Sequence, residues 1–98
     1  MSFLVLMTGG KAGDRYRLVK EKTILGRHPG CDIVVDSGSV SRQHAAVEMK
    51  DGDWWIEDLL SRNGTLINGA KLNGPQQLEA ADDIGVCEVR LVFTVGDT

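Results

Sequence analysis

The sequence predicts an all-β fold, a sandwich or barrel assembled from many short strands. Dipeptides that supply the positive φ angles of tight turns recur along the chain, and short runs rich in β-branched and aromatic residues lie between them. With 98 residues, the chain has the length of one domain and is too short for two independent cores. The turn dipeptides are Gly9-Gly10, Asp51-Gly52, Asn63-Gly64, Asn68-Gly69 and Asn73-Gly74.

The first expected element is a buried strand over the apolar residues Ser2 to Met7. This run is far too short to span a bilayer, and it has neither the charged start nor the cleavage site of a secretion signal. We therefore expect no membrane partner and a cytoplasmic location.

A hairpin is expected around Asp51-Gly52. A two-residue turn there pairs Lys50 with Asp53, Met49 with Trp54 and Val47 with Ile56. Alternation then places Val47, Met49, Trp54 and Ile56 on one face, and the mostly polar Glu48, Trp55 and Glu57 on the other. A shift of one residue would bury the charges, so this register is well specified. Trp54 or Trp55 is expected to face inward as a core residue, and the other to lie on the sheet surface.

Two further elements are expected toward the C-terminus. Pro75 to Ala81 has a weak helical tendency but is barely two turns long, so extended structure with one helical turn at most is expected. In the run from Val89 to Val95, apolar residues at every second position predict a strand. We read the tail Gly96-Asp97-Thr98 as the place where a linker to another domain was cut, and residues 1–98 as a single domain of a longer, multidomain protein.

Charge narrows the range of partners. The formal net charge is −3 and the isoelectric point about 5.2, whereas non-specific binding to nucleic acid needs a cationic surface. No nucleic-acid partner is expected, although a local basic patch is compatible with this balance. The two cysteines, Cys31 and Cys87, are a weak disulfide signal, and we expect both to be small, buried or half-buried residues in a reducing compartment.

Four polar motifs follow predicted strands, where the loops of a sandwich gather at one rim. Together they offer three guanidinium groups, several hydroxyls and an asparagine amide, but no carboxylate pair. This set of groups suits the binding of an anion better than proton transfer. The motifs are Gly26-Arg27, Ser41-Arg42-Gln43-His44, Ser61-Arg62-Asn63-Gly64-Thr65 and Asn68-Gly69.

The order and spacing of these motifs resemble the forkhead-associated (FHA) domain, a phosphothreonine-binding module. The likeness runs from about Leu4 to Phe93 and includes the stretches Cys31 to Val35 and Val40 to Ala45. The resemblance implies a sandwich of two twisted, mostly antiparallel sheets with about eleven short strands. It also implies that a phosphopeptide binds across the loops at one end.

The resemblance assigns five residues to phosphopeptide binding. Arg27 matches the arginine that reaches the phosphate oxygens, a task suited to its bidentate, permanently charged fork. Ser41 matches the serine whose hydroxyl and backbone N–H donate to the phosphate, and Arg42 stands where a second phosphate contact is frequent. Asn63 matches the asparagine that bonds the peptide backbone beside the phosphothreonine, and Arg62 stands where another donor is often found.

Six residues are assigned to the support of this site. Gly26 permits the tight exit of its strand, and His44 matches a histidine that braces the recognition loop from inside. Asn68-Gly69 resembles a structural turn that fixes the loop carrying Asn63, and Gly64 and Thr65 complete the support. Two departures stand out. Ala81-Asp82 replaces the Gly-Asp usual before the penultimate strand, and Ser39 replaces an arginine that in some members selects an acidic residue after the phosphothreonine.

Other interpretations of the same residues are weaker. Ser41, His44 and Asp58 suggest a hydrolytic triad, but the sequence lacks a nucleophile elbow. Residues 9–13 resemble a phosphate-binding loop only superficially. His28, His44 and the two cysteines have no metal-ligand spacing, so no metal and no cofactor are expected.

The expected function is therefore non-enzymatic. The domain is predicted to bind phosphothreonine in partner proteins, or in its own chain, downstream of a Ser/Thr protein kinase. The alternative is a protein-interaction scaffold on the same fold that works without phosphate, through a sheet face near Trp55.

Overall fold

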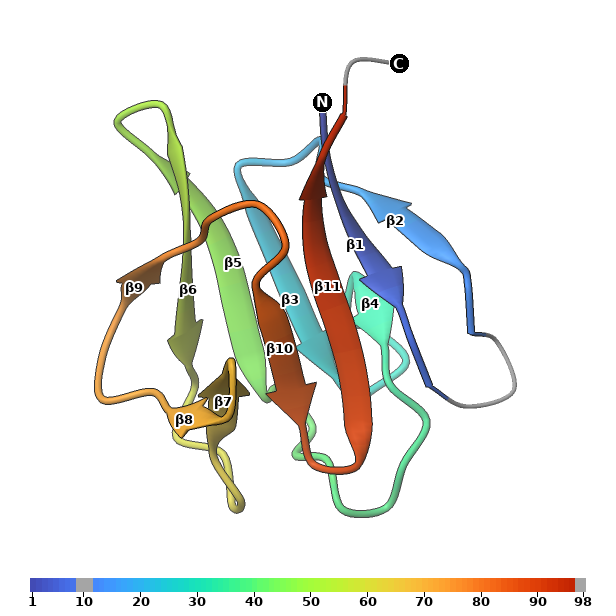
Figure 1. Cartoon of the computed structure of the whole chain (residues 1–98). Helices are drawn as coiled ribbons and strands as arrows, with labels where there is room; N and C mark the ends of the chain where they lie inside the picture. Colours follow the sequence, from blue (N-terminus) through green and yellow to red (C-terminus); the bar gives the residue numbers. More distant parts are fainter. Residues whose placement is uncertain (9–11, 97–98) are drawn as a thin grey trace.

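The computed structural model describes residues 1–8 and 12–96, which form eleven strands in two facing sheets and no helix (Figure 1). Within these ranges there is accordingly no helical segment able to span a membrane. The predicted all-β sandwich is confirmed. The expected Gly9-Gly10 turn, the first part of the glycine-rich run 9–13 and the end of the tail at 97–98 lie outside the described residues.

The first sheet contains six strands in the order β2-β1-β11-β10-β7-β8, and all neighbouring pairs are antiparallel. The long strands β1 and β11 run side by side and join residues near the two ends of the chain. The bounds are β1 Ser2–Leu6, β2 Arg15–Arg17, β7 Thr65–Ile67, β8 Ala70–Lys71, β10 Asp83–Val86 and β11 Val89–Val95.

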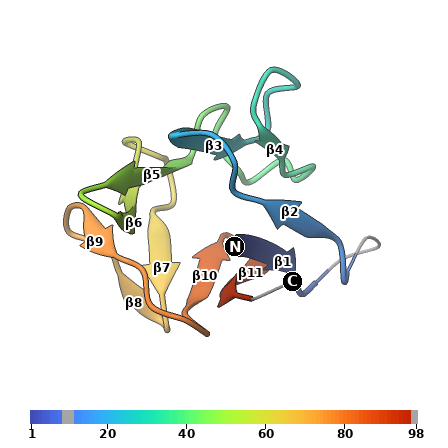
Figure 2. The same cartoon turned by 90° about the horizontal axis from the view of Figure 1, so that it is seen from above.

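The second sheet contains five strands in the order β4-β3-β5-β6-β9, in which only β3 and β4 are parallel. Seen from above in Figure 2, the two sheets form facing layers, so each presents one side to the other. The bounds are β3 Lys22–Gly26, β4 Ile33–Val34, β5 Ala45–Lys50, β6 Asp53–Asp58 and β9 Gln76–Gln77.

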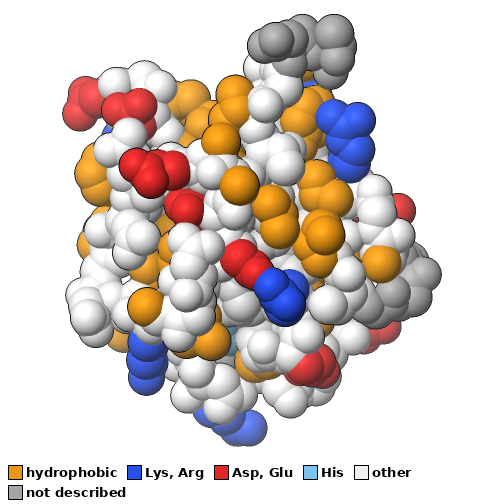
Figure 3. Space-filling view, viewed as in Figure 1, with side chains coloured by type: hydrophobic (Ala, Val, Ile, Leu, Met, Phe, Trp, Pro, Cys, Tyr) orange, Lys and Arg blue, Asp and Glu red, His pale blue; other side chains and the backbone are white. Residues whose placement is uncertain are grey.

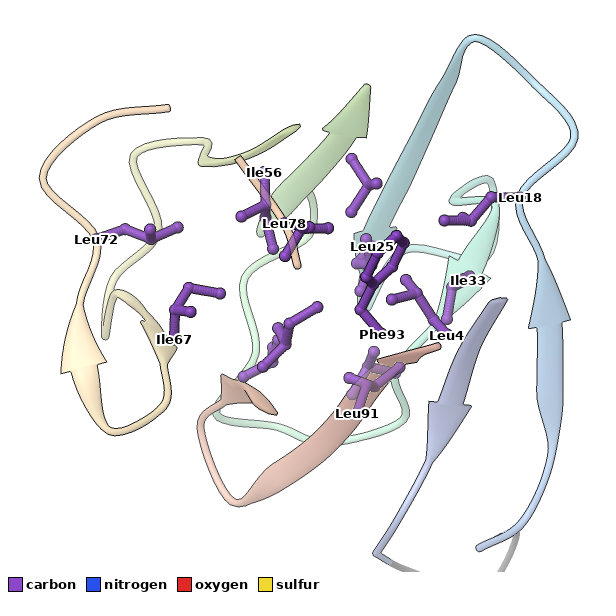
Figure 4. Close-up of a cluster of buried hydrophobic side chains, with 14 of the residues drawn as sticks. Leu4, Leu18, Leu25, Ile33, Ile56, Ile67, Leu72, Leu78, Leu91 and Phe93 are labelled. Carbon is purple, nitrogen blue, oxygen red and sulfur yellow. The ribbon is translucent and has the colours of Figure 1, made fainter. Parts of the chain in front are cut away.

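The core fills the space between the sheets with aliphatic side chains from both. Leu4 and Leu91 on the first sheet and Leu25 and Ile56 on the second have no exposed surface, and Phe93 joins them (Figure 4). Each fully buried side chain of this size contributes about 1.5–3 kcal/mol relative to exposure. The two sheets are therefore held together mainly by this contact, which leaves the loops at their ends free for other tasks.

The β5–β6 hairpin has the predicted register, with Met49 opposite Trp54 and Val47 opposite Ile56. Val47 and Ile56 are fully buried, while Trp54 is half-buried and packs against the core. Trp55 is also half-buried, but it lies on the other face of the sheet. The expected division between an inward and an outward tryptophan is therefore confirmed.

The C-terminal elements also follow the prediction, with one exception at a strand end. Residues 75–79 are extended and lead into a turn at Ala80-Ala81, and Gln76 and Gln77 pair with β6. Leu91 and Phe93 are buried as alternation requires, but Val95, the next residue of the same alternating series, is 59% exposed at the end of β11.

The turn at Ala81 keeps the shape of a glycine turn without the glycine. The amide of Asp82 donates to the carbonyl of Glu79 at 3.0 Å, and Ala81 has a φ of 75°. This is the third position of a type II turn, which glycine normally occupies. Asp82 holds the turn through its carboxylate, which accepts from the Glu79 amide at 2.8 Å and from the Asn68 side chain at 2.9 Å. The sequence departure thus leaves the turn in place with a residue that is strained there.

The loops that carry most of the predicted site motifs lie at one end of the molecule, and Met1 and Gly96 lie at the other. The loops after β3, before β5, between β6 and β7 and between β10 and β11 gather at the lower end in Figure 1. At the opposite end, Met1 and Gly96 bond each other through two backbone groups, at 2.8 and 2.9 Å. Whatever the loops bind is therefore approached from the end away from the chain termini.

Candidate functional site

The exit of β3 is bonded tightly to the loop before β5. The amides of Arg27 and His28 donate to the carbonyls of Ser41 and Arg42, at 3.0 and 3.2 Å. A Cβ on Gly26 would lie 2.1 Å from the carbonyl oxygen of Arg42, so no other residue fits at this position. The expected role of Gly26 is thus explained by a backbone-to-backbone contact, and it sets where Arg27 leaves the strand.

Arg27 points to the loop end with most of its guanidinium free. Its Nε donates to the carbonyl of Val40 at 3.0 Å, which fixes the plane of the group, and its terminal nitrogens bond no described residue. A guanidinium held by one nitrogen and open at the others is prepared for bidentate contact with an oxyanion.

His44 connects the two loops of the site from inside. It has no exposed surface, and its Nδ1 accepts the Ser41 amide at 3.1 Å while its Nε2 lies 2.8 Å from the carbonyl of Gly64. Because Nδ1 accepts, the proton must be on Nε2, which then donates to Gly64; this assigns a neutral tautomer. The predicted bracing role of His44 follows from these two bonds.

Ser41 is held differently from the expectation in one respect. Its backbone N–H, expected to face the phosphate, donates to His44 instead. Its hydroxyl oxygen accepts the amide of Arg62 at 3.0 Å, which turns the hydroxyl hydrogen away from that amide. The hydroxyl is therefore the donor that Ser41 can offer to a ligand.

The loop between β6 and β7 is built around Asp58, whose role here the sequence analysis did not identify. Its carboxylate accepts from the amide of Ser61 at 2.9 Å, from the hydroxyl of Thr65 at 2.7 Å and from the hydroxyl of Ser61. Burial opposes the charge of Asp58, but these hydrogen bonds outweigh it and lower the pKa of the carboxyl below its ordinary value. An Asp three residues before a Ser at a strand end is a turn signal that would have predicted this arrangement.

These bonds also set Asp58 apart from the triad that Ser41 and His44 suggested. Both ring nitrogens of His44 bond backbone groups, and Asp58 bonds Ser61 and Thr65. The three residues therefore do not form the serine–histidine–aspartate relay. Among the described residues, no group of three or more His, Cys, Asp or Glu side chains is arranged to hold a metal ion.

Gly64 and Thr65 end the loop between β6 and β7. Gly64 has a φ of 80°, and a Cβ there would lie 2.7 Å from Cε of Lys71. Its amide donates to the hydroxyl of Ser61 at 2.9 Å, and Thr65 is fully buried. Together they return the chain from the exposed residues 62–63 into β7.

Asn68-Gly69 forms the predicted tight turn but does not lie at the loop end. It joins β7 to β8 with φ angles of 51° and 86°, the values of a type I′ turn. The Asn68 side chain bonds Asp82, and its oxygen accepts the amide of Asp83 at 2.9 Å. Because β7 carries the chain away from the other motifs, this pair anchors the far end of that strand.

Three arginines and two serines line one pocket of about 220 Å³. Its walls come from the β3 exit and from the two loops that His44 connects, and they include no carboxylate. Figure 3 shows basic side chains at this lower end of the molecule. The lining residues are Arg27, Gly38, Ser39, Val40, Ser41, Arg42 and Arg62. The pocket therefore concentrates positive charge on a chain whose net charge is −3.

Asn63 stands beside this pocket. Its Nδ2 donates to the carbonyl of Ser39 at 2.9 Å and lies 3.6 Å from Sγ of Cys87, which itself donates to the same carbonyl at 3.1 Å. Asn63 thus joins the β6–β7 loop to the pocket wall and to the β10–β11 turn. Cys87, like Cys31, is a free, half-buried thiol.

Comparison with known proteins gives a consistent result. The family model described as FHA domain matches residues 23–87, which include all the predicted phosphopeptide-binding residues. The chain is 39% identical over 95 residues to the oxoglutarate dehydrogenase inhibitor of Corynebacterium efficiens; this alignment spans 97% of the chain and 66% of that protein. It is 36% identical over 95 residues to the glycogen accumulation regulator GarA of Mycolicibacterium smegmatis, over 97% of the chain and 60% of that protein.

A solved structure shows the same fold. Mycobacterium tuberculosis EmbR in complex with a low-affinity phosphopeptide superposes with a TM-score of 0.90 at 29% identity, over 99% of this chain and 25% of that one. The chain thus spans no more than about two thirds of the length of each of these relatives. On the match of the family model and of the fold, the chain belongs to the FHA domain family.

Proposed function

We propose that this domain binds phosphothreonine in partner proteins through the pocket formed by Arg27, Ser41, Arg42 and Arg62, with Asn63 beside it. The observation that carries the proposal is that three arginines and two serines line one pocket whose lining residues include no acid. Phosphate brings about −1.5 to −2 charges and three acceptor oxygens at neutral pH. The negative charge and acceptor oxygens of the phosphate therefore complement the positive charge and hydrogen-bond donors of the pocket residues.

The expected affinity is moderate and depends on the phosphate. Hydrogen bonds to charged groups are each worth about 1.5–3 kcal/mol net. Three or four of them give binding in the micromolar range after the cost of association is subtracted. A peptide without phosphate loses most of this, and a preference for threonine over serine follows if the pocket encloses the extra methyl group, an effect of roughly 10- to 200-fold.

The function of the EmbR and GarA relatives supports the proposal in general terms. The EmbR structure contains a phosphopeptide, and the sequence relatives are named as an oxoglutarate dehydrogenase inhibitor and a glycogen accumulation regulator. We infer that this chain acts in the same way, as a non-enzymatic docking domain of a longer protein in the cytoplasm, downstream of a Ser/Thr kinase. Binding to a phosphothreonine in its own chain belongs to the same proposal.

The experiment is a titration of the domain with an oriented library of phosphothreonine peptides, with phosphoserine and unphosphorylated copies as controls. Binding confined to the phosphothreonine peptides is expected. If a demonstrably folded sample binds none of the phosphopeptides, the phosphate-independent scaffold replaces the proposal.

Arg27→Ala tests the pocket itself. Because Arg27 offers its free nitrogens to the phosphate, the variant is expected to lose at least tenfold in affinity for the best phosphopeptide, measured by calorimetry. Arg17→Ala, which removes an exposed arginine from β2, is the matched control and should leave the affinity unchanged. Equal affinity of the Arg27 variant and the unaltered domain would remove Arg27 from the site.

A further inference from the structure

The β10–β11 turn is bonded at two points to the loop that carries part of the pocket wall. The hydroxyl of Ser37 donates to Oε2 of Glu88 at 2.6 Å, and the thiol of Cys87 donates to the carbonyl of Ser39 at 3.1 Å. Ser37 and Ser39 flank Gly38, which lines the pocket together with Ser39. Figure 1 shows the turn beside this loop at the lower end of the molecule.

Asn63 extends this contact into a continuous surface. Its side chain donates to the carbonyl of Ser39 and lies against Cys87. The pocket wall, Asn63 and the β10–β11 turn therefore contact one another in sequence. A peptide that places a phosphate in the pocket extends from it in two directions, and because Asn63 and the β10–β11 turn adjoin the pocket wall, we infer that one half of the peptide passes over them. The side chains on that half of the peptide therefore meet the charge of Glu88.

Glu88 places a negative charge next to the positively charged pocket. The pocket is lined by three arginines and no acid, whereas Glu88 is an exposed carboxylate fixed by Ser37 at the pocket's margin. The Ser37 hydroxyl holds the pKa of Glu88 below its ordinary value, so the group is ionised at neutral pH. Acidic peptide residues are attracted by the arginines on one side and repelled by Glu88 on the other.

We propose that Glu88 is a specificity-determining residue, which selects phosphothreonine peptides with a lysine or arginine on the half of the peptide that passes over Asn63 and the β10–β11 turn, and disfavours acidic residues there. The inference rests on the proposed phosphothreonine binding and adds the chemistry of the flanking residues. Since Glu88 is exposed, its effect is that of a surface charge pair, about two- to fivefold in affinity, and it weakens as salt is raised.

The test uses phosphothreonine peptides with alanine at all flanking positions except one, which carries lysine or glutamate at each place from three before to three after the phosphothreonine. For the unaltered domain, lysine should bind about two- to fivefold tighter than glutamate at positions on one side only. In Glu88→Gln this ratio should approach one, and in Glu88→Lys it should invert.

Asp36→Asn is the matched control, because Asp36 is an exposed acid in the loop that carries Ser37 but does not bond the β10–β11 turn. It should leave the ratio unchanged. The all-alanine phosphopeptide reports whether each variant keeps an intact pocket. An unchanged lysine-to-glutamate ratio in both Glu88 variants, or an equal change in Asp36→Asn, overturns the role of Glu88. Failure of every phosphopeptide to bind the unaltered domain would instead overturn the proposed function.

Discussion

At the scale of single residues, the site depends on groups that would not touch a ligand. His44 lies fully inside, yet its two ring nitrogens fix Ser41 and Gly64 on different loops. Asp58 collects three donors and fixes the loop from which Arg62 and Asn63 extend. This framework is already satisfied by hydrogen bonds before a ligand arrives, so it can hold the exposed arginines close together against their mutual repulsion.

Asp58→Asn tests this framework through the pH dependence of stability. The folded-state pKa of Asp58 lies below the unfolded value of about 3.9. Its contribution is therefore present in full above that unfolded value and is lost as pH falls through the folded-state pKa. The variant should lose about 1–2 kcal/mol at pH 7, since the group is half-buried and partly screened by solvent.

The measurement is urea unfolding of both proteins at pH 7 and at a series of lower pH values. The difference between them should shrink as pH falls below the unfolded-state pKa of about 3.9 and Asp58 becomes protonated in the folded state. A difference that stays constant over this range would show that the charge of Asp58 does not contribute, and that only the shape of the side chain matters.

At the scale of elements, turns decide how the strands place the site. The Glu79–Asp82 turn directly precedes β10. The carboxylate of Asp82 accepts a hydrogen bond from Asn68, which lies just after the end of β7. The same strand begins at Thr65, directly after the loop of the site. Ala81 carries the cost of this arrangement, because an L-residue with a side chain is strained at a φ of 75°.

Ala81→Gly is expected to stabilise the domain by about 0.5–1 kcal/mol, because relief of the left-handed strain exceeds the extra flexibility that glycine gives to the unfolded chain. Thermal or urea unfolding measures the effect, with Ala80→Gly in the same turn as the control. A loss of stability in Ala81→Gly equal to that in Ala80→Gly would mean that Ala81 is not strained.

At the scale of the whole molecule, the pocket and the chain termini occupy opposite ends of the sandwich (Figure 1). Two backbone bonds hold Met1 and Gly96 together at the end away from the loops around the pocket. This arrangement lets other domains be attached without covering the pocket.

Fusion of a folded protein to either terminus is therefore expected to leave phosphopeptide affinity within about twofold of the unfused domain, a difference of less than about 0.5 kcal/mol. Fluorescence anisotropy with one labelled phosphothreonine peptide measures both fusions. The contrasting insertion, a short glycine–serine segment between Cys87 and Glu88, should weaken binding, because it separates the turn from Ser37 and Ser39. A terminal fusion that weakens binding as much as this insertion contradicts the arrangement.

Part of this architecture is determined by the sequence alone. Asp51-Gly52 and the alternation on both sides of it determine the β5–β6 register, because a shift of one residue would bury charges. Gly26, Ser41, His44 and Asn63 belong to local motifs, so their order and spacing were enough to reveal the resemblance to the FHA domain that predicts their roles. The single all-β domain follows from the density of turn signals.

The tertiary structure decided what depends on segments far apart in the chain. The sequence correctly predicts a turn at Asn68-Gly69, but only the structure shows that β7 carries this turn away from the pocket. The contact of Ser37 with Glu88 joins residues 51 positions apart, and no local pattern announces it. Short-range propensity determines turns and registers because its causes lie within a few residues, whereas the composition of a pocket depends on how two sheets, held by a non-directional core, bring their loops together.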